Sequence, residues 1–283
     1  MTANVFERSM GDVLRTLFDR SAGELVIVDP NAAVIESLVD AGSDYDEGLP
    51  TLNVLADNRM LKDVMDDFLV AGDAADLVDA GSMTLRELDG DADNTLVVGE
   101  DELYAIVSAG EHVAALAADD ESFAGDAYET YRDQWADADE FNLRTPALSH
   151  VRETLDDDIG DPVRADFDAV LASLETARGD GDGLDEVTIS LLVAAKNDVL
   201  LYDISKWGED VGIASKATFS RTKTHLEDLG LIDTEKVPID VGRPRLRLKL
   251  GDDRLRDASS DELASVAHRL LNQAGAPGRV PSR

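Results

Sequence analysis

The hydrophobic pattern of residues 206–250 changes from a helical period to a strand period within a few residues. On a helix that starts near Ser215, the inward face comprises Phe219, Thr222, Leu226 and Leu229. Gly230 follows at once, and glycine ends helices because it tolerates a positive φ. From Arg243 to Leu250, cations then alternate with apolar residues, as in a strand with one basic and one apolar face. We therefore expect a helix followed by a basic hairpin.

Two further helices are predicted before this one, at residues 185–195 and 202–211. Gly212 would end the second, residues 213–215 would make a turn, and Ser215 would cap the next helix. Three helices with a tight turn between the last two, followed by a hairpin, predict an α+β winged helix-turn-helix domain over residues 184–255. A further helix at residues 260–273 and a tail would complete a C-terminal segment, 256–283.

This fold predicts contact with double-stranded DNA, because its last helix enters the major groove. The outward side of that helix carries short or hydrogen-bonding side chains, with Arg221 able to pair with guanine. Lys216 and Lys223 flank this side and are expected to hold phosphates. The predicted DNA-contacting residues of the helix are Ser215, Lys216, Ala217, Thr218, Ser220, Arg221, Lys223 and Thr224.

The hairpin supplies a second predicted contact, through the basic face of its last strand. That face comprises Arg243, Arg245, Arg247 and Lys249. Gly242-Arg243-Pro244 would hold one arginine on an exposed turn, where it can enter a narrow minor groove. The alternative is a solvated basic strand without a ligand. A chain that otherwise avoids basic residues has little reason to place four of them here.

Charge is distributed unevenly along the chain. Residues 184–283 hold 15 basic and 16 acidic residues, against 11 and 44 in residues 1–183, which gives net charges of −1 and −33. A basic partner is one explanation for the acidic part. A cytoplasm of molar salt is the one we favour, because a carboxylate-rich surface stays soluble there and only seven of the 26 basic residues are lysine.

The acidic part alternates between strand and helix patterns. Strands are predicted at residues 24–29, 51–56, 83–88, 95–98, 103–108 and 112–118. Helices are predicted at residues 4–20, 31–40, 58–71, 74–80 and 120–138. The first three strands with their helices form a βαβαβ pattern, and the later ones have short connections. We therefore expect an α/β domain over residues 1–145, with a mixed, partly parallel sheet and flanking helices, that serves as sensor or dimerisation domain.

Residues 146–183 are expected to link the two domains. Helices are predicted at residues 149–157 and 162–178, and Gly179–Gly183 would form a polar hinge.

Several segments of the chain resemble a known family. The segments SKATFSRTKTHLEDLGLI and VGRPRLRLKL, within residues 213–250, resemble archaeal winged-helix transcription regulators. With the N-terminal segment NVFERSMGDVLRTLFDR, nearly the whole chain is similar to haloarchaeal TbsP-type regulators. The segment 123–141 is also similar to the end of the sensor domain of TrmB-type sugar-responsive regulators, in which the DNA-binding unit comes first. The resemblance implies a transcription regulator that acts on central carbon metabolism.

An effector site is predicted where parallel strands end in the α/β domain. Its residues are Asn31, Asn58, Arg59 and Lys62. Arg59 and Lys62 lie in the first turn of a helix, where an anionic metabolite such as a phosphate or carboxylate could bind. The alternative is that both are surface residues paired to nearby aspartates.

No catalytic set, cofactor motif or metal site is expected. The four histidines are scattered, there is no cysteine, and no phosphate-binding or zinc-binding motif occurs. Nor does the sequence contain an apolar run long enough for a membrane helix, so we expect a cytoplasmic protein.

The sequence therefore predicts a transcription regulator that is not an enzyme and that acts as a homodimer, because one winged helix reads too few base pairs. The helices at residues 162–178, 260–273 and 120–138 are candidate dimer elements. The alternative function is an acidic scaffold whose winged helix binds protein instead of DNA.

Overall fold

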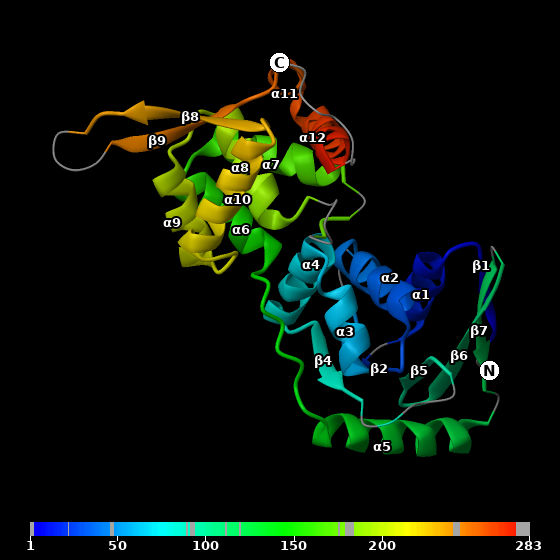
Figure 1. The fold of residues 1–283 in the computed structure, drawn as a ribbon. Helices are drawn as coiled ribbons and strands as arrows, with labels where there is room; N and C mark the ends of the chain where they lie inside the picture. Colours follow the sequence, from blue (N-terminus) through cyan, green and yellow to red (C-terminus); the bar gives the residue numbers. More distant parts are fainter. Residues whose placement is uncertain are drawn as a thin grey trace. The chain divides into compact units, whose positions relative to one another are not determined.

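A computed structural model divides the chain into two compact units, Met1–Ala147 (the first unit) and Leu148–Arg283 (the second unit) (Figure 1). The structure describes residues 3–21, 23–45, 48–88, 90, 94–110, 112–118, 120–174, 176–178, 184–239 and 244–275. The predicted hinge Gly179–Gly183 and the tail beyond residue 275 lie outside the described residues.

The described part of the first unit contains a mixed sheet of seven strands in the order β1-β7-β6-β5-β2-β3-β4. The strands are β1 Val5–Glu7, β2 Glu24–Val28, β3 Thr51–Ala56, β4 Met83–Glu87, β5 Leu96–Gly99, β6 Glu102–Ala109 and β7 His112–Ala117. As predicted, β2, β3 and β4 run parallel, while the later strands pair antiparallel through β5. The α/β fold class with a partly parallel sheet is confirmed.

Helices cover both faces of this sheet (Figure 1). They are α1 Met10–Arg20, α2 Ala32–Ser43, α3 Asn58–Val64, α4 Phe68–Asp79 and α5 Glu121–Asp137. The period of two along β2 separates the faces, since Leu25 and Ile27 pack with α1 to α4, whereas Val26 and Val28 pack beneath α5. The near-continuous apolar run of β2 therefore reflects burial on both sides.

Three predicted helices of the first unit differ in the structure. Residues 5–7 form β1, because Val5 is buried and pairs with Ala115 of β7, and α1 begins only after the cap Ser9. The helices expected at residues 58–71 and 74–80 are divided at another place, because α3 ends at Val64 and α4 runs from Phe68 through to Asp79. The carboxylate of Asp67 accepts a hydrogen bond from the Leu69 amide and starts the second helix.

The second unit surrounds one buried helix. Its elements are α6 Leu148–Asp158, α7 Asp161–Ala172, α8 Glu186–Lys196, α9 Leu201–Val211, α10 Lys216–Asp228, β8 Ile232–Val237, β9 Arg245–Leu250, α11 Asp253–Arg256 and α12 Ser260–Gly275. Every residue of α8 from Val187 to Ala195 is buried, and the helix packs against α7, α9, α10 and β9. Its apolar character all round follows from this central position.

Residues 148–172, which we expected to link the domains, belong to the second unit. The indole N–H of Trp207 in α9 donates to Thr154 Oγ1 in α6 over 3.1 Å, and α7 packs on α8 and α12. The predicted domain boundary at residue 145 lies close to the observed one, but α6 and α7 supply core surface for the winged-helix fold. The helix expected to reach residue 178 ends at Ala172.

Candidate nucleic-acid interface

A close crossing of α9 and α10 forms the helix-turn-helix. α9 ends at Gly212, whose φ of +94° is a left-handed conformation that favours glycine, and Ser215 caps α10 by accepting from the Thr218 amide. Inside α9, a Cβ at Gly208 would clash with the ring of Phe219, which is fully buried. These features hold α10 close against the domain, so that only its other side is free.

The outward face of α10 matches the prediction for most of its residues. Ala217, Ser220, Arg221, Thr224 and His225 are exposed. Phe219 and Leu226 are buried on the opposite side. Arg221 Nη2 lies 3.3 Å from Thr218 Oγ1, a neutral partner that leaves most of the guanidinium's donors available. Short side chains around one arginine fit a major groove about 12 Å wide.

Lys223 requires a correction. It is only 8% exposed, and its Nζ lies 2.7 Å from Glu227 Oε2. Thr234 of β8 donates to the other oxygen of Glu227 over 2.8 Å. Helical spacing placed Lys223 at the edge of the outward face, but its long stem lies in the seam between α10 and the hairpin. It therefore links these two elements and is not positioned to hold a phosphate.

The hairpin consists of β8 and β9, which pair antiparallel with Glu235 opposite Arg247 (Figure 1). Leu248 and Leu250 are buried, whereas the alternate residues Arg245, Arg247 and Lys249 are partly exposed. The predicted period of two is thus present in β9. Arg243 and the hairpin tip lie outside the described residues.

Each described cation of β9 contacts a carboxylate from another element. Arg245 lies 3.4 Å from Asp203 and its guanidinium stacks 4.3 Å from the centroid of Tyr202. The other pairs are Arg247 with Glu235 at 3.6 Å and Lys249 with Asp198 at 2.6 Å. The basic face of the strand therefore carries its own acidic partners.

The start of α10 has the same arrangement. Glu209 of α9 accepts from both the side chain and the backbone amide of Lys216, and these hydrogen bonds lower the pKa of the Glu209 carboxyl. One turn earlier, Lys206 pairs with Asp210 at 2.6 Å and lowers the pKa of that carboxyl by hydrogen bonding. Lys216 thus lies where a phosphate contact was predicted, and it already has an acidic partner.

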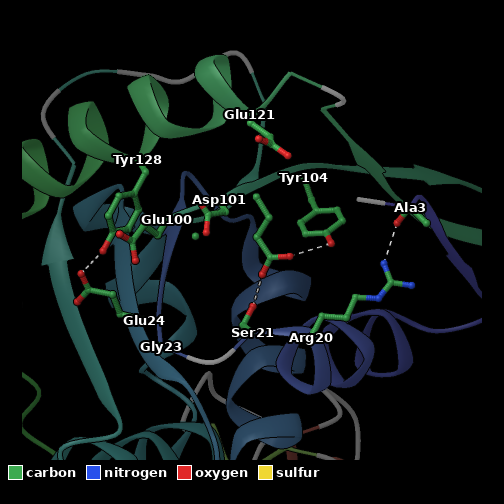
Figure 2. Close-up of a pocket in the computed structure, with 12 residues that line it drawn as sticks. Ala3, Arg20, Ser21, Gly23, Glu24, Glu100, Asp101, Tyr104, Glu121 and Tyr128 are labelled. Atoms are coloured by element: carbon green, nitrogen blue, oxygen red, sulfur yellow. Dashed lines mark hydrogen bonds between the residues drawn. The ribbon is translucent and has the colours of Figure 1, made fainter. Parts of the chain in front are cut away.

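The first unit contains a cavity of about 980 Å³ at the amino end of β2 (Figure 2). Its lining residues are Ala3, Arg20, Ser21, Gly23, Glu24, Gly99, Glu100, Asp101, Glu102, Tyr104, Glu121 and Tyr128. The Tyr128 hydroxyl donates to Glu24, and burial followed by this hydrogen bond raises the pKa of Tyr128 to about 12. With five carboxylates and one arginine, the cavity repels an anionic metabolite.

The four predicted effector residues lie toward the other end of β2 and β3, and the described lining of the cavity includes none of them. The Asn31 side chain caps α2. The Asp57 carboxylate accepts from the amides of Arg59 and Met60 at 2.9 and 3.0 Å, so an acidic group already occupies the start of α3. Asn58 is half-buried, and Arg59 and Lys62 are exposed. An anion site there stays a prediction that this geometry does not favour.

Within the described ranges, no three histidine, aspartate or glutamate residues are grouped to hold a metal ion. No helix in those same ranges is long and apolar enough to cross a membrane.

Two family models divide the chain where the structure does. The model described as "Transcriptional regulator TbsP-like, N-terminal" matches residues 2–146, and "Transcriptional regulator TbsP-like, C-terminal HTH domain" matches residues 147–268. The chain belongs to the TbsP-like transcriptional regulators. The resemblance to this family is thereby confirmed, and the C-terminal unit is its DNA-binding helix-turn-helix domain. TbsP-like proteins are described as regulators and not as enzymes.

Among solved structures, the TbsP-like chain is similar to TrmBL2, an archaeal chromatin protein whose title reports a novel mode of DNA binding. The two are 13% identical with a TM-score of 0.34, and the match covers 50% of this chain. The chain spans about half the length of that protein, 54%. A search of curated proteins finds no match.

Proposed function

We propose that this TbsP-like chain is a cytoplasmic, sequence-specific regulator that places α10 in the major groove and the β8–β9 hairpin over the adjacent backbone and minor groove. The observation that carries the proposal is the outward face of α10. There Ser220, Arg221 and Thr224 are exposed around a helix whose inward face is fixed by Phe219 and Leu226. Asp228, the exposed carboxylate of this helix, lies in its last turn, away from the predicted contact.

A homodimer is part of the proposal. One recognition helix contacts about three or four base pairs, so specific control requires two half-sites, spaced by about one helical turn. Of the candidate dimer elements, α7 and α12 pack on each other, and α5 covers one face of the sheet. Two chains bound per duplex in a stoichiometric titration would support the dimer, and one chain per specific site would contradict it.

A duplex selected from random DNA by the wild-type chain provides the test, with binding followed by fluorescence anisotropy. Arg221→Ala should weaken binding about 10- to 100-fold and relax the preference at one base pair, because a bidentate arginine contributes about 1–3 kcal/mol of discrimination. Arg8→Ala is the matched control, since it removes an exposed arginine that lies outside the helix-turn-helix, the hairpin and the candidate dimer helices. Undiminished binding by Arg221→Ala would contradict the role of α10. Capture of a protein partner without DNA binding would favour the scaffold alternative.

Control of central carbon metabolism in response to a metabolite is the finer part of the proposal, and it rests on the family resemblance. Genomic sites bound in cells grown on two carbon sources test it directly. Occupancy that shifts at genes of sugar metabolism would support it, whereas the same occupancy on both sources would contradict it.

A further inference from the structure

Four cations of the proposed DNA surface, Lys216, Arg245, Arg247 and Lys249, share one arrangement: each is paired with a carboxylate from a different element of the second unit. The acidic partners are Asp198, Asp203, Glu209 and Glu235. They come from the α8–α9 connection, from α9 and from β8. None belongs to the same helix or strand as its cation. The pairing therefore depends on the tertiary fold.

We propose that these four carboxylates are tethered counterions of the DNA-binding surface. They neutralise Lys249, Arg245, Lys216 and Arg247 in the free protein and give way to DNA phosphates on binding. By this exchange they set how strongly the affinity depends on salt. The inference rests on the proposed DNA contact of α10 and the hairpin.

Because the ion pairs are exposed, replacing a carboxylate by a phosphate costs little free energy. The carboxylate side chains of the β9 pairs are 56% exposed for Asp198, 41% for Asp203 and 57% for Glu235. Ion pairs this exposed contribute about 0–1 kcal/mol, so a phosphate can replace the carboxylate at little cost. Lys223 and Glu227 form the contrasting pair, at 10% and 27% exposure, and are too enclosed to exchange.

The exchange changes the ion balance of binding. Double-stranded DNA releases about 0.9 bound cations for each phosphate that a protein neutralises, which makes binding weaken steeply with salt. A carboxylate freed from its arginine or lysine attracts cations from solution and so offsets part of this release. The wild-type chain should therefore show a shallower salt dependence than a surface whose cations have no acidic partner.

The same pairs also limit the affinity at low salt, because DNA must compete with a carboxylate attached to the protein. Removing the carboxylates should therefore tighten binding most at low salt. The advantage should shrink as salt rises, because the steeper salt dependence of the variant brings the two affinities together.

Asp198 and Glu235 allow the cleanest substitutions. Asp198 has a φ of +58°, a left-handed conformation that asparagine also adopts, so Asp198→Asn should keep the backbone geometry. Its carboxylate contacts Lys249 of β9. Glu235 faces solvent on β8 and contacts Arg247. Glu209 is less suitable, because it also accepts from the backbone of α10.

The test compares the double variant Asp198→Asn/Glu235→Gln with wild type in the full chain, on one duplex over a salt series. We expect affinity about 3- to 10-fold tighter at the lowest salt and a log–log salt slope steeper by about one. Asp44→Asn/Glu140→Gln is the matched control. It removes two exposed carboxylates of the first unit, each paired with an arginine from another element, Arg15 and Arg86, outside the proposed DNA surface.

Three outcomes would overturn the inference. Equal changes in the test and control variants would indicate a general charge effect. Weaker binding, or an unchanged slope, in the test variant would mean that the carboxylates only position their cations. Failure of the wild-type chain to bind any duplex would overturn the proposed function as well. Circular dichroism and a melting curve for each variant confirm that the fold is retained.

Discussion

The two units use carboxylates in different ways. In the first unit, acidic side chains line the cavity at Glu100, Asp101 and Glu102 and face few cations. In the second unit, four carboxylates around α10 and β9 each lie against a lysine or arginine from another element. Net charge alone therefore does not tell whether a carboxylate serves solubility or neutralises a binding surface.

Basic residues differ in the same way. Arg86 in the first unit points into the protein, where its Nη1 donates to the carbonyl oxygens of Trp135, Ala136 and Ala138 at the end of α5. Arg245 in the second unit points to a partly exposed surface. In the first unit, which has few cations, Arg86 stabilises the fold. In the winged-helix unit, Arg245 and its neighbours lie at a surface. Adaptation to molar salt remains our explanation for the acidic excess, and it stays a prediction.

The largest expected effect tests whether the two units are independent. Phe219→Ala removes a fully buried ring between α9 and α10 and should lower the free energy of unfolding of the second unit by about 3–5 kcal/mol. Phe18→Ala does the same in the core of the first unit. Urea unfolding followed by hydrogen exchange, which reports each unit separately, measures the effects.

Only the unit that carries the substitution should lose protection in each case. If both units lose protection together, they unfold as one cooperative body. The contrast between them would then be one of surface charge and not of separate stability.

A smaller effect is expected from Arg86→Ala. The loss of charge-assisted hydrogen bonds to three carbonyls, and of the stacking 4.3 Å from the Trp135 ring, should destabilise the first unit by about 1–3 kcal/mol. Arg59→Ala, at an exposed position of the same unit, should be nearly neutral. The shift in melting temperature measures both. Equal shifts would mean that Arg86 has no special structural role.

The smallest effect concerns pH. Because the pKa of Tyr128 is raised to about 12 in the folded chain, its contribution to stability is complete below the unfolded value near 10 and is lost as the pH rises through 12. Tyr128→Phe should therefore flatten the decline in stability between these values. Tyr202→Phe, in the second unit, is the control. Urea midpoints across this range measure the difference, and parallel curves for wild type and Tyr128→Phe would contradict it.

Local periodicity explains what could be predicted from the sequence. Three patterns each depend on one element and its nearest neighbours in the sequence. They are the apolar run Leu25–Val28, the alternation along β9, and the Gly212 that ends α9 just before the Ser215 cap of α10. Such patterns predicted the parallel strands, the helix-turn-helix and the outward face of α10. The confirmed family resemblance added the regulator function, which periodicity alone does not specify.

Long-range contacts explain what could not be predicted. Residues 5–7 join an edge of the sheet only because β7, more than one hundred residues later, offers a partner. Asp198 contacts Lys249 and Asp203 contacts Arg245 across roughly half that separation in the sequence. The inward position of Lys223 depends on Glu227 and on Thr234 of the hairpin. Helical spacing predicts the direction in which a side chain leaves its helix, but it does not predict which other element packs against that side chain.

The hydrogen bond from the Leu248 amide to the Val199 carbonyl, 2.9 Å long, joins β9 to the connection between α8 and α9. The strand is thus held on one side by β8 and on the other by this connection. These contacts restrain the described base of the hairpin relative to the helices of its unit. In the proposed complex, an operator whose groove spacing does not match the distance between α10 and the hairpin would have to deform, so the stiffness of the DNA would contribute to recognition.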